Sequence, residues 1–463
     1  MMICIQRNPQ STQPPRVADV WPDPSPIRPG QTVLIKPNLV LHAHPRGGDV
    51  RCLIAEGRVL RELLDCVAKD LQGRGRIVVG DSPLQTTEFT GAIEATGIRA
   101  AIADFEQASG LSVDIVDFRQ VHAERDAGGH IQAWREVPGD PAGYVTFDLD
   151  GDSLLCPHEA DSHKFRVSNY QAADTMQYHG RQTHRYVIAK SVIDADVIIS
   201  LPKMKTHCKV GVTLSMKNFV GTVGRKQCLA HHREGGAPAG GDEYPDRSRL
   251  KAISVHLENA IDGCRSGWKR ELLKLLYRVN ERLIKTLGIN PIRDGGWHGN
   301  DTCWRMTVDL VRIARYGCAD GTLADTPQRQ VLTLVDGLIA GEGEGPLEAV
   351  ARPAHTLVYG DNPLLTDIFT ATFMGFDYRK ISLLREACQL SRWPLLDKTP
   401  NADAPSSGWK AEVNGVRMTV PELIASGECM NFAPPMGWVG TMESEASPKT
   451  GRISDFVHLC KNP

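Results

Sequence analysis

Short apolar runs that end in polar residues alternate with segments of helical periodicity in the first part of the chain. Residues 32–38, 76–83 and 111–117 are such runs, and each has the length and the bounding turn residues of a strand. Residues 51–71 repeat apolar side chains at the spacing of one helix face, and a second helix is expected from about Thr87. This alternation predicts an α/β fold with a mainly parallel, layered sheet.

Residues 195–200 form a further apolar run, bounded by polar residues, that predicts a buried parallel strand. The segment after it, residues 201–218 (LPKMKTHCKVGVTLSMKN), contains Lys203, Lys205, His207, Lys209 and Lys217. In open α/β sheets, ligands bind at the carboxyl ends of strands, so this concentration of cations predicts a site for a carboxylate, a phosphate or both. A solvated surface loop is the alternative, but the apolar residues between the lysines favour burial.

Three of the predicted strands end in polar residues that suit one common site. The residues concerned are Lys36 and Asn38, then Asp81 and Ser82, then Lys203, Lys205, Thr206 and His207. If these strands are neighbours, their end residues meet at one edge of the sheet. A lysine ammonium is a point charge with three donors, which suits an anion. His207 is the best candidate for a general acid or base because an imidazole titrates near neutrality, although a structural histidine is an equal alternative.

The distribution of glycine, proline and charge predicts four parts. These are an irregular, proline-rich lead-in at 1–30, an α/β domain at 31–221, a linker with a helical insertion at 222–325, and a C-terminal α/β lobe with a tail at 326–463. The last part contains expected strands at 331–336 and 356–361, a glycine-rich turn at 337–346, and a helix at 363–374.

Residues 267–288 predict an amphipathic helix inside the insertion. Its apolar residues are Leu272, Leu275, Leu276, Val279, Leu283 and Leu287, and its basic residues are Lys269, Arg270, Lys274, Arg278, Arg282 and Lys285. With Trp268, such a helix suits the surface of an anionic membrane. Packing of the apolar face against the rest of the protein is the interpretation that we favour.

Composition and charge narrow the class of protein. The formal net charge of −2 lacks the basic surplus of a nucleic-acid-binding chain, so we expect a small anionic molecule and no nucleic acid as the partner. The twelve cysteines are scattered without a C-x-x-C pair, which disfavours an iron–sulfur cluster. We expect no transmembrane segment and no signal peptide, and therefore a cytoplasmic protein with reduced thiols. The oligomeric state stays open.

Two sets of residues are candidates for holding a metal ion. His207 with His231 or His232 suits nickel or zinc, but adjacent side chains diverge, so we expect only one of the vicinal pair to contribute. The second set is formed by the carboxylates Asp336, Glu342, Glu344 and Asp361, which lie in or beside glycine-rich turns. These carboxylates suit Mg²⁺, and turn geometry alone is the alternative.

Residues 295–302 (GGWHGNDT) form a polar and aromatic patch in front of a helix predicted at 303–316. Asp301 or Thr302 is the expected N-cap of that helix. Trp297, Asn300 and Asp301 are candidates for contacting a substrate.

Several of these motifs together resemble one bacterial family. Those motifs are 196–207 (DVIISLPKMKTH), 211–213 (GVT), Lys217 with Asn218, 335–337 (VDG), 343–346 (GEGP), 360–363 (GDNP) and 374–377 (MGFD). They resemble the family known as domain of unknown function 362, over residues 32–381. Some members of that family append a ferredoxin-like cluster domain, whose cysteines are absent from this sequence.

A more distant resemblance connects residues 206–217 with the nickel-pincer lactate racemases. Those enzymes carry a pattern PHYFAGFSGGRK, and this chain keeps its histidine, glycine and lysine at the same spacing. The resemblance implies that His207 is the acid or base, that Lys217 anchors the cofactor, and that His231 or His232 falls near a metal-binding histidine. It implies a nickel-pincer nucleotide, or another divalent metal, as the cofactor.

The chain departs from the racemase pattern in two turns. The Gly-Thr-His-Arg-Pro turn that holds a second catalytic histidine is replaced by residues 80–83 (GDSP), and the Asp-x-Thr-Arg turn by residues 36–38 (KPN). Two-base racemisation is therefore not supported by these motifs.

Our leading hypothesis is an enzyme that acts on a small anionic, hydroxyl-bearing substrate by proton or hydride transfer, as an isomerase, an epimerase or an oxidoreductase. His207, Lys217 and Lys205 form its catalytic set, and Lys36, Lys203 and Asn218 contribute to binding. The alternatives are a Mg²⁺-dependent hydrolase or phosphotransferase and a non-catalytic, membrane-associated binding protein.

Overall fold

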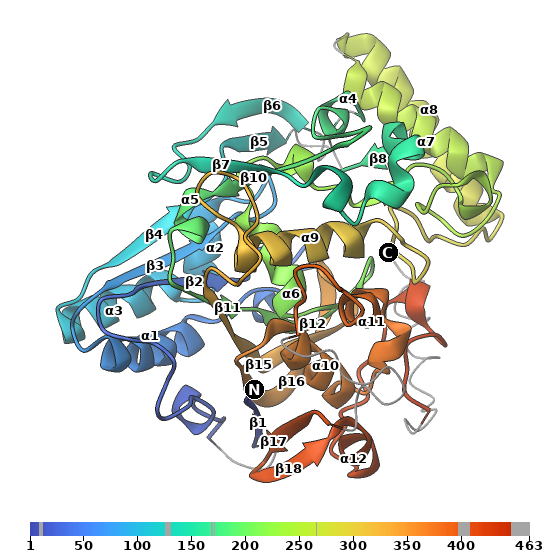
Figure 1. Cartoon of the computed structure of the whole chain (residues 1–463). Helices are drawn as coiled ribbons and strands as arrows, with labels where there is room; N and C mark the ends of the chain where they lie inside the picture. The colour runs from blue at the N-terminus through green and yellow to red at the C-terminus, as the bar shows by residue number, and fades with distance from the viewer. Residues whose placement is uncertain are drawn as a thin grey trace.

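The computed structural model describes residues 1–8, 13–125, 131–167, 170, 172–264, 266–396 and 408–445. Its centre is a mixed but mainly parallel sheet, which confirms the predicted α/β class (Figure 1). The order of the strands is β18-β17-β1-β16-β15-β11-β2-β3-β4, and β12 and β13 extend beside β15. These strands are β1 (Ile3–Arg7), β2 (Thr32–Pro37), β3 (Arg76–Asp81), β4 (Val113–Asp117), β11 (Val197–Leu201), β12 (Lys203–His207), β13 (Gly211–Thr213), β15 (Gln330–Glu344), β16 (Glu348–Gly360), β17 (Lys410–Val413) and β18 (Val416–Thr419).

Successive side chains of the central strands point alternately into two apolar layers, one on each face of the sheet. On β2, Val33 and Ile35 pack with α1 (Gly57–Leu71) and α3 (Ile98–Ser109). Leu34 faces the other way, into a larger cluster that contains residues of α9 and α10. The remaining helices on the two sides are α2 (Phe89–Ala95), α6 (Ser215–Asn218), α9 (Cys303–Tyr316), α10 (Pro363–Phe373), α11 (Ser382–Ala387) and α12 (Val420–Ala425).

The strands β11, β2 and β3 are parallel neighbours, as the position of their polar ends required. Their carboxyl ends therefore lie side by side at one edge, where β12 continues from β11 after a single residue. This edge is the place at which an open α/β sheet binds ligands.

Two local predictions are corrected by the structure. The glycine-rich segment at 337–346 is mostly strand, because β15 continues through it and pairs antiparallel with β16 up to Glu344. The expected irregular lead-in contains β1, which pairs with β16 and β17. Strands from the N-terminal and C-terminal parts share one sheet through the pairing of β11 with β15. The boundaries at residues 30, 221 and 325 stay predictions.

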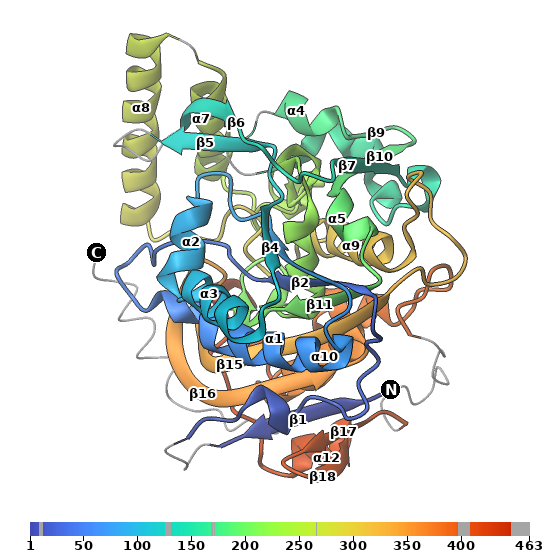
Figure 2. The ribbon, with the colours of Figure 1, turned by 90° about the vertical axis from the view of Figure 1, so that its left-hand side faces the viewer.

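Smaller elements cover the edge above the sheet. The small sheets are formed by β5 (Val121–Arg125) with β6 (Ile131–Glu136), β7 (Tyr144–Asp148) with β10 (Thr183–Ala189) and β9 (His179–Gly180), and β8 (Phe165–Arg166) with β14 (His232–Arg233). The helices of this region are α4 (Ala172–Met176), α5 (Lys190–Ile193), α7 (Arg249–Gly263) and α8 (Gly267–Thr286). In both views, α8 lies at the outer margin of the molecule beside α7 (Figures 1 and 2).

The expectation that the apolar face of α8 packs against the protein is wrong. Asn280 and Ile284 are the buried residues of this helix, and they lie on the face toward α7. The predicted apolar residues lie on another face and are 44–60% exposed, and Trp268 is 70% exposed. The helix thus uses one face for packing and leaves a second, apolar face in solvent.

A buried ion pair joins β12 to β15. Lys203 Nζ lies 2.6 Å from Asp336 Oδ2, and both side chains are fully buried. The same carboxylate accepts the backbone N–H of Glu56, at the start of α1. A charge buried without its partner is strongly destabilising, so this pair fixes β12 against β15.

We therefore expect Lys203→Met to lower the free energy of unfolding by about 3–5 kcal/mol, because Asp336 is left buried without a counter-charge. Urea denaturation of the purified protein measures this change. The double variant Lys203→Met/Asp336→Leu removes both charges and should recover most of the loss. A single variant as stable as the wild type would show that the pair does not hold β12 in place.

Candidate functional site

A cavity of about 690 Å³ lies at the carboxyl edge formed by β2, β3 and β12. Its polar lining includes Lys36, Asn38, Asp81, Ser82, Lys205, His207, Lys209, Thr213, Lys217, Asn218, Lys226 and His231. The structure thus brings together the polar ends of the three strands that the sequence singled out. Whether they bind a ligand stays a prediction.

Lys36 and Asp81 form the closed floor of this cavity. Lys36 Nζ lies 2.7 Å from Asp81 Oδ1 and donates to Asn218 Oδ1 at 2.6 Å. Gly221 presses against the pair, since a Cβ there would lie 2.0 Å from Asp81 Oδ1. The charge of Lys36 is therefore already neutralised, and its role is to position Asn218 rather than to hold an anion by itself.

Four other lysines line the cavity without a carboxylate partner. Among the described residues, no ion pair within 4.0 Å joins Lys205, Lys209, Lys217 or Lys226 to an acidic group. Lys205 donates to Asn38 Oδ1 at 3.0 Å and to the carbonyl of Leu53, and Lys226 donates to the carbonyl of Ser82 at 2.6 Å. These acceptors are neutral, so they leave the positive charge of both lysines uncompensated.

The ammonium groups of Lys209 and Lys217 have even fewer hydrogen-bond partners. The Nζ atom of Lys209 is buried with no hydrogen-bond partner in the described part of the chain. Lys217 is 7% exposed, and in the described part of the chain its Nζ makes no hydrogen bond to an acceptor. Two ammonium donors therefore have unused capacity inside the cavity.

Burial changes the ionisation of these lysines. Burial, together with the weaker effect of neighbouring lysines, lowers the pKa of Lys205 to about 7, and burial lowers the pKa of Lys226 to about 7. Burial also lowers the pKa of Lys217. Removing an ammonium from water disfavours its charged form, and a bound anion would reverse that effect.

The two histidines of the cavity are held in opposite tautomers. His207 Nδ1 accepts the backbone N–H of Lys209 at 3.0 Å, so the proton of the neutral ring lies on Nε2. His231 Nδ1 lies 2.8 Å from the carbonyl of Leu229, which can only accept, so its Nε2 keeps the lone pair. Burial, then Lys217 and other nearby lysines, lower the pKa of both rings well below the usual value, so both are neutral at pH 7.

This pair offers one donor and one acceptor on the same cavity. His207 presents an N–H that can protonate or polarise an oxygen, and His231 presents a nitrogen that can take a proton or ligate a metal. The sequence named His207 as the acid or base and His231 only as a metal ligand. The backbone contacts that set the tautomers have no local sequence signal.

Several predicted site residues lie outside the cavity. Lys203 is paired with Asp336, and Thr206 donates its hydroxyl to the carbonyl of Gly343 at 2.8 Å. Neither residue lines the cavity, because the side chain of each is engaged by β15 or by the loop that follows it.

The four predicted magnesium ligands are not gathered at one point. Asp336 is paired with Lys203, Glu342 with Arg352 at 2.6 Å, and Asp361 accepts the backbone N–H of Met2. Glu344 lines the cavity, and its carboxylate accepts the backbone N–H of Met436. Each carboxylate has a separate structural partner, so the geometry does not support a shared Mg²⁺.

The patch at 295–302 is a structural loop. Thr302 is the N-cap residue of α9, as predicted, but its side chain makes no capping hydrogen bond. Asn300 Oδ1 instead accepts the backbone N–H groups of Thr302 and Cys303. Trp297 Nε1 donates to the carbonyl of Asp242, and Asp301 binds His158 and Arg305. None of the three predicted substrate contacts lines the cavity.

Two groups of three donor atoms, each within 4.8 Å of one another, occur in the described part of the chain. One joins His232 to Glu243 and Asp294, and the other joins Cys156, Glu159 and His184. Neither includes His207 or His231, so the predicted histidine cluster is not formed as a three-ligand set.

Lys226 was missed by the sequence-based prediction. It follows Arg225 in a short polar stretch, which is typical of a solvated pair of charges. Only the fold shows that its ammonium reaches back to Ser82 at the end of β3. No local pattern carries that information.

Comparison with known proteins gives a family resemblance but no activity. Residues 157–372, which include β12, α6 and β15, match the family model described as Domain of unknown function (DUF362). A thylakoid-associated protein of Synechocystis sp. is 40% identical over 82 residues, which are 16% of this chain and 26% of that protein. The chain thus spans only about a quarter of that relative's length.

A crystal structure of a protein from Thermotoga maritima aligns with 71% of this chain and 50% of its own, at 11% identity and a TM-score of 0.29. The resemblance to lactate racemases is not among these matches. The match over residues 157–372 supports the resemblance of this chain to the family of domain of unknown function 362.

Proposed function

We propose that the chain is an enzyme that binds a small, hydroxyl-bearing carboxylate in the lysine-lined cavity and moves a proton at the carbon that bears the oxygen. One observation carries this proposal. Four buried lysines without carboxylate partners surround two neutral histidines, one offering an N–H and the other a lone pair.

The charge of the cavity supports an anionic substrate. Ammonium groups in a site of low dielectric attract an anion more strongly than they would in water. Lys209 and Lys217 have unused donors for carboxylate oxygens, and Lys205 and Lys226 regain full charge when an anion neutralises their surroundings. The cavity volume of about 690 Å³ accommodates a small ligand.

The histidines support proton transfer. His231 Nε2 takes the proton from the carbon, the electron pair of the broken C–H bond moves toward the carboxylate, and the N–H of His207 donates to the developing oxyanion. Return of both protons regenerates the rings and gives an isomer or epimer. Lys205, with its pKa lowered to about 7, is a further group that can exchange a proton near neutrality.

Hydride transfer is the variant implied by the racemase resemblance. Lys217 suits the anchoring role, because its buried amine lines the cavity without a hydrogen-bond acceptor among the described residues. His231 Nε2 suits a nickel ligand. A nickel-pincer nucleotide would supply the hydride acceptor that the side chains of the protein cannot provide.

A membrane-bound role is the second candidate, and the surface of α8 favours it. The exposed apolar residues Leu272, Leu275, Leu276, Val279 and Leu283 share one face of the helix. The helix carries six basic and two acidic residues, and Arg278 and Arg282 border that face. A basic amphipathic helix of this kind binds in the interface of an anionic membrane.

No helix in the described part of the chain has the length and apolarity needed to cross a membrane. We therefore propose peripheral attachment of a cytoplasmic protein through α8. The name of the Synechocystis relative associates that protein with a membrane, but the shared segment is short.

We expect anion binding to weaken as the pH rises through and above about 7, because Lys205 and Lys226 lose their protons in that range. Calorimetric titration with lactate at pH about 6 and about 9 should show at least a tenfold lower affinity at the higher pH, since two charges change. Lys217→Met should weaken binding at both values. Lys190→Met, which removes a surface lysine paired with Asp194, is the control and should bind like the wild type. Equal affinity at both pH values would contradict the proposed anion site.

We expect His231→Gln and His207→Gln each to slow exchange of the carbon-bound proton by about 10²–10⁴-fold, which is the usual contribution of a positioned acid or base. The measurement is deuterium incorporation from D₂O into lactate, glycerate and malate, followed by NMR. His256→Gln, at an exposed position on α7, is the matched control.

Exchange that continues unchanged in both variants would eliminate the proton-transfer proposal. Turnover that instead requires nickel, together with an adduct on Lys217 in the intact mass, would support hydride transfer.

We expect the wild type to sediment with vesicles that contain anionic phospholipid, and the double variant Leu276→Asp/Leu283→Asp to bind them at least about tenfold more weakly, since each lost apolar contact is worth more than a kcal/mol. Added salt should also weaken binding. Val416→Asp, a similarly exposed apolar position on β18, is the control. If the wild type stays in the supernatant, α8 does not bind lipid.

A further inference from the structure

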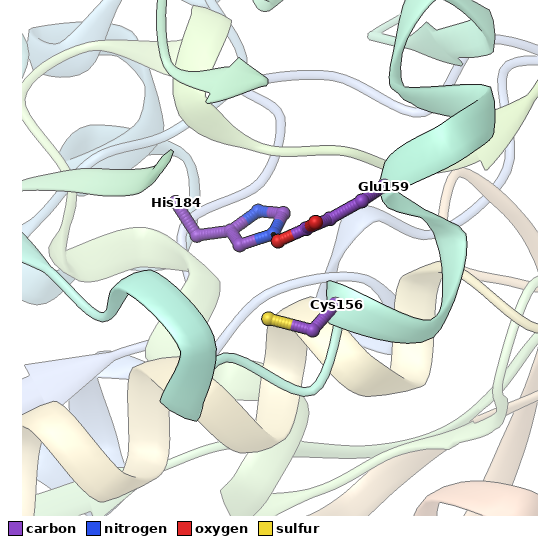
Figure 3. A group of neighbouring side chains, drawn as sticks. All are labelled: Cys156, Glu159 and His184. Carbon is purple, nitrogen blue, oxygen red and sulfur yellow. Dashed lines mark ion pairs between the residues drawn. The ribbon is translucent and has the colours of Figure 1, made fainter. Parts of the chain in front are cut away.

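Cys156, Glu159 and His184 converge at a point away from the lysine-lined cavity (Figure 3). Cys156 and Glu159 lie three residues apart in the 3-10 helix η4 (Cys156–Lys164), where side chains with this spacing share a face. His184 comes from β10 and points toward the same place (Figure 3). The sulfur, one carboxylate oxygen and one ring nitrogen all lie within 4.8 Å of one another.

A chain of hydrogen bonds fixes the tautomer of His184. His179 Nε2 lies 2.6 Å from the carbonyl of Cys228, so the proton of His179 is on Nε2. With the proton of the neutral His179 ring on Nε2, its Nδ1 can only accept a hydrogen bond. That acceptor lies 3.2 Å from His184 Nδ1, which must therefore carry the proton of the second ring.

The lone pair of His184 is consequently on Nε2, the nitrogen nearest to Glu159. This atom is completely buried and has no hydrogen-bond partner in the described part of the chain. Its distance to Glu159 Oε1 is 3.9 Å, too long for a hydrogen bond. Two ligand atoms of one tetrahedral Zn²⁺, with bonds of about 2.0–2.1 Å, lie roughly 3.4 Å apart, so a small contraction would place both on one ion.

We propose that Cys156 Sγ, Glu159 Oε1 and His184 Nε2 bind one Zn²⁺ ion. The hydrogen bond from His184 to His179 is the support that metal-binding histidines usually have. The thiol of Cys156 loses its proton to solvent when the metal binds, and the thiolate and the carboxylate then balance the two positive charges of the ion. Cys156 and Glu159 are half-buried, so water can supply the fourth ligand.

The site would join η4 to β10 and thereby to the small sheet of β7, β10 and β9. Without a bound ion, His184 Nε2 has no hydrogen-bond partner in the described part of the chain. Burial and Glu159 raise the pKa of the Cys156 thiol to about 11, and the thiol donates to the carbonyl of Asp150. This inference is independent of the proposed activity, since none of its three ligands lines the lysine-lined cavity.

Titration of the purified, metal-free protein with Co²⁺ tests the site, because thiolate bound to Co²⁺ gives a charge-transfer band in the near ultraviolet. We expect one equivalent to produce this band and Zn²⁺ to displace it. Cys156→Ser should abolish the band, and Glu159→Gln should weaken Co²⁺ binding at least about tenfold. His179→Asn, which removes the support for His184 without removing a ligand, should weaken binding by about 10–100-fold.

Cys264→Ser is the matched control, since Cys264 is also half-buried and its thiol also contacts a backbone carbonyl. It should bind Co²⁺ like the wild type. Circular dichroism verifies that each variant is folded, and the partly exposed Glu159→Gln keeps the test valid if His179→Asn does not fold. Co²⁺ binding without a thiolate band would place the ion elsewhere, as at His232 with Glu243 and Asp294, and would overturn the proposal. So would a band that survives in Cys156→Ser.

Discussion

The burial of lysine ammonium groups at one edge of the sheet is the constraint on which the structure depends. An ammonium removed from water needs a counter-charge, or else its charged form becomes unfavourable. Lys203 and Lys36 receive carboxylates, Asp336 and Asp81, and these pairs tie β12 to β15 and β2 to β3. Lys205 receives only neutral acceptors at the same edge. The difference separates lysines that hold the fold from lysines available to a ligand.

The placement of Lys217 shows how the paired charges serve the unpaired ones. Lys217 lies in α6, a single turn whose first backbone N–H groups, those of Ser215 and Met216, donate to Asp367. At the other end, Asn218 binds Lys36 and the backbone of β2. The turn is thus held at both ends by buried groups. Its lysine is presented to the cavity by a rigid support, as a binding or catalytic group requires.

Periodicity was sufficient to predict the central strands, α9 and the convergence of Lys36, Asp81 and Lys205, because each depends on local pattern and on the rule that parallel strands share an edge. It was not sufficient for β15, because the glycines at 341, 343 and 345, at its end and just after it, have the composition of a turn. Gly341 and Gly345 are needed there because a Cβ would lie within 2.7 Å and 2.0 Å of the backbone of Cys52 and Thr206. Contacts between residues distant in sequence, such as the hydrogen bond from Lys226 to Ser82, could not be predicted from periodicity either. Tertiary contacts determine the structure at such positions, and the local composition of the sequence does not reveal those contacts.

The exposed helix and the cavity are physically connected through the segment that follows α8. Arg293 lies 2.8 Å from Glu258 on α7 and also binds Glu281 on α8. Arg293 and its neighbours Pro291, Ile292 and Asp294 line the cavity. Since these ion pairs are partly buried, the α7–α8 hairpin and this wall of the cavity are held together. Attachment of the apolar face of α8 to a surface would therefore also orient the cavity relative to that surface, which joins the two candidate roles of the protein in a single geometry.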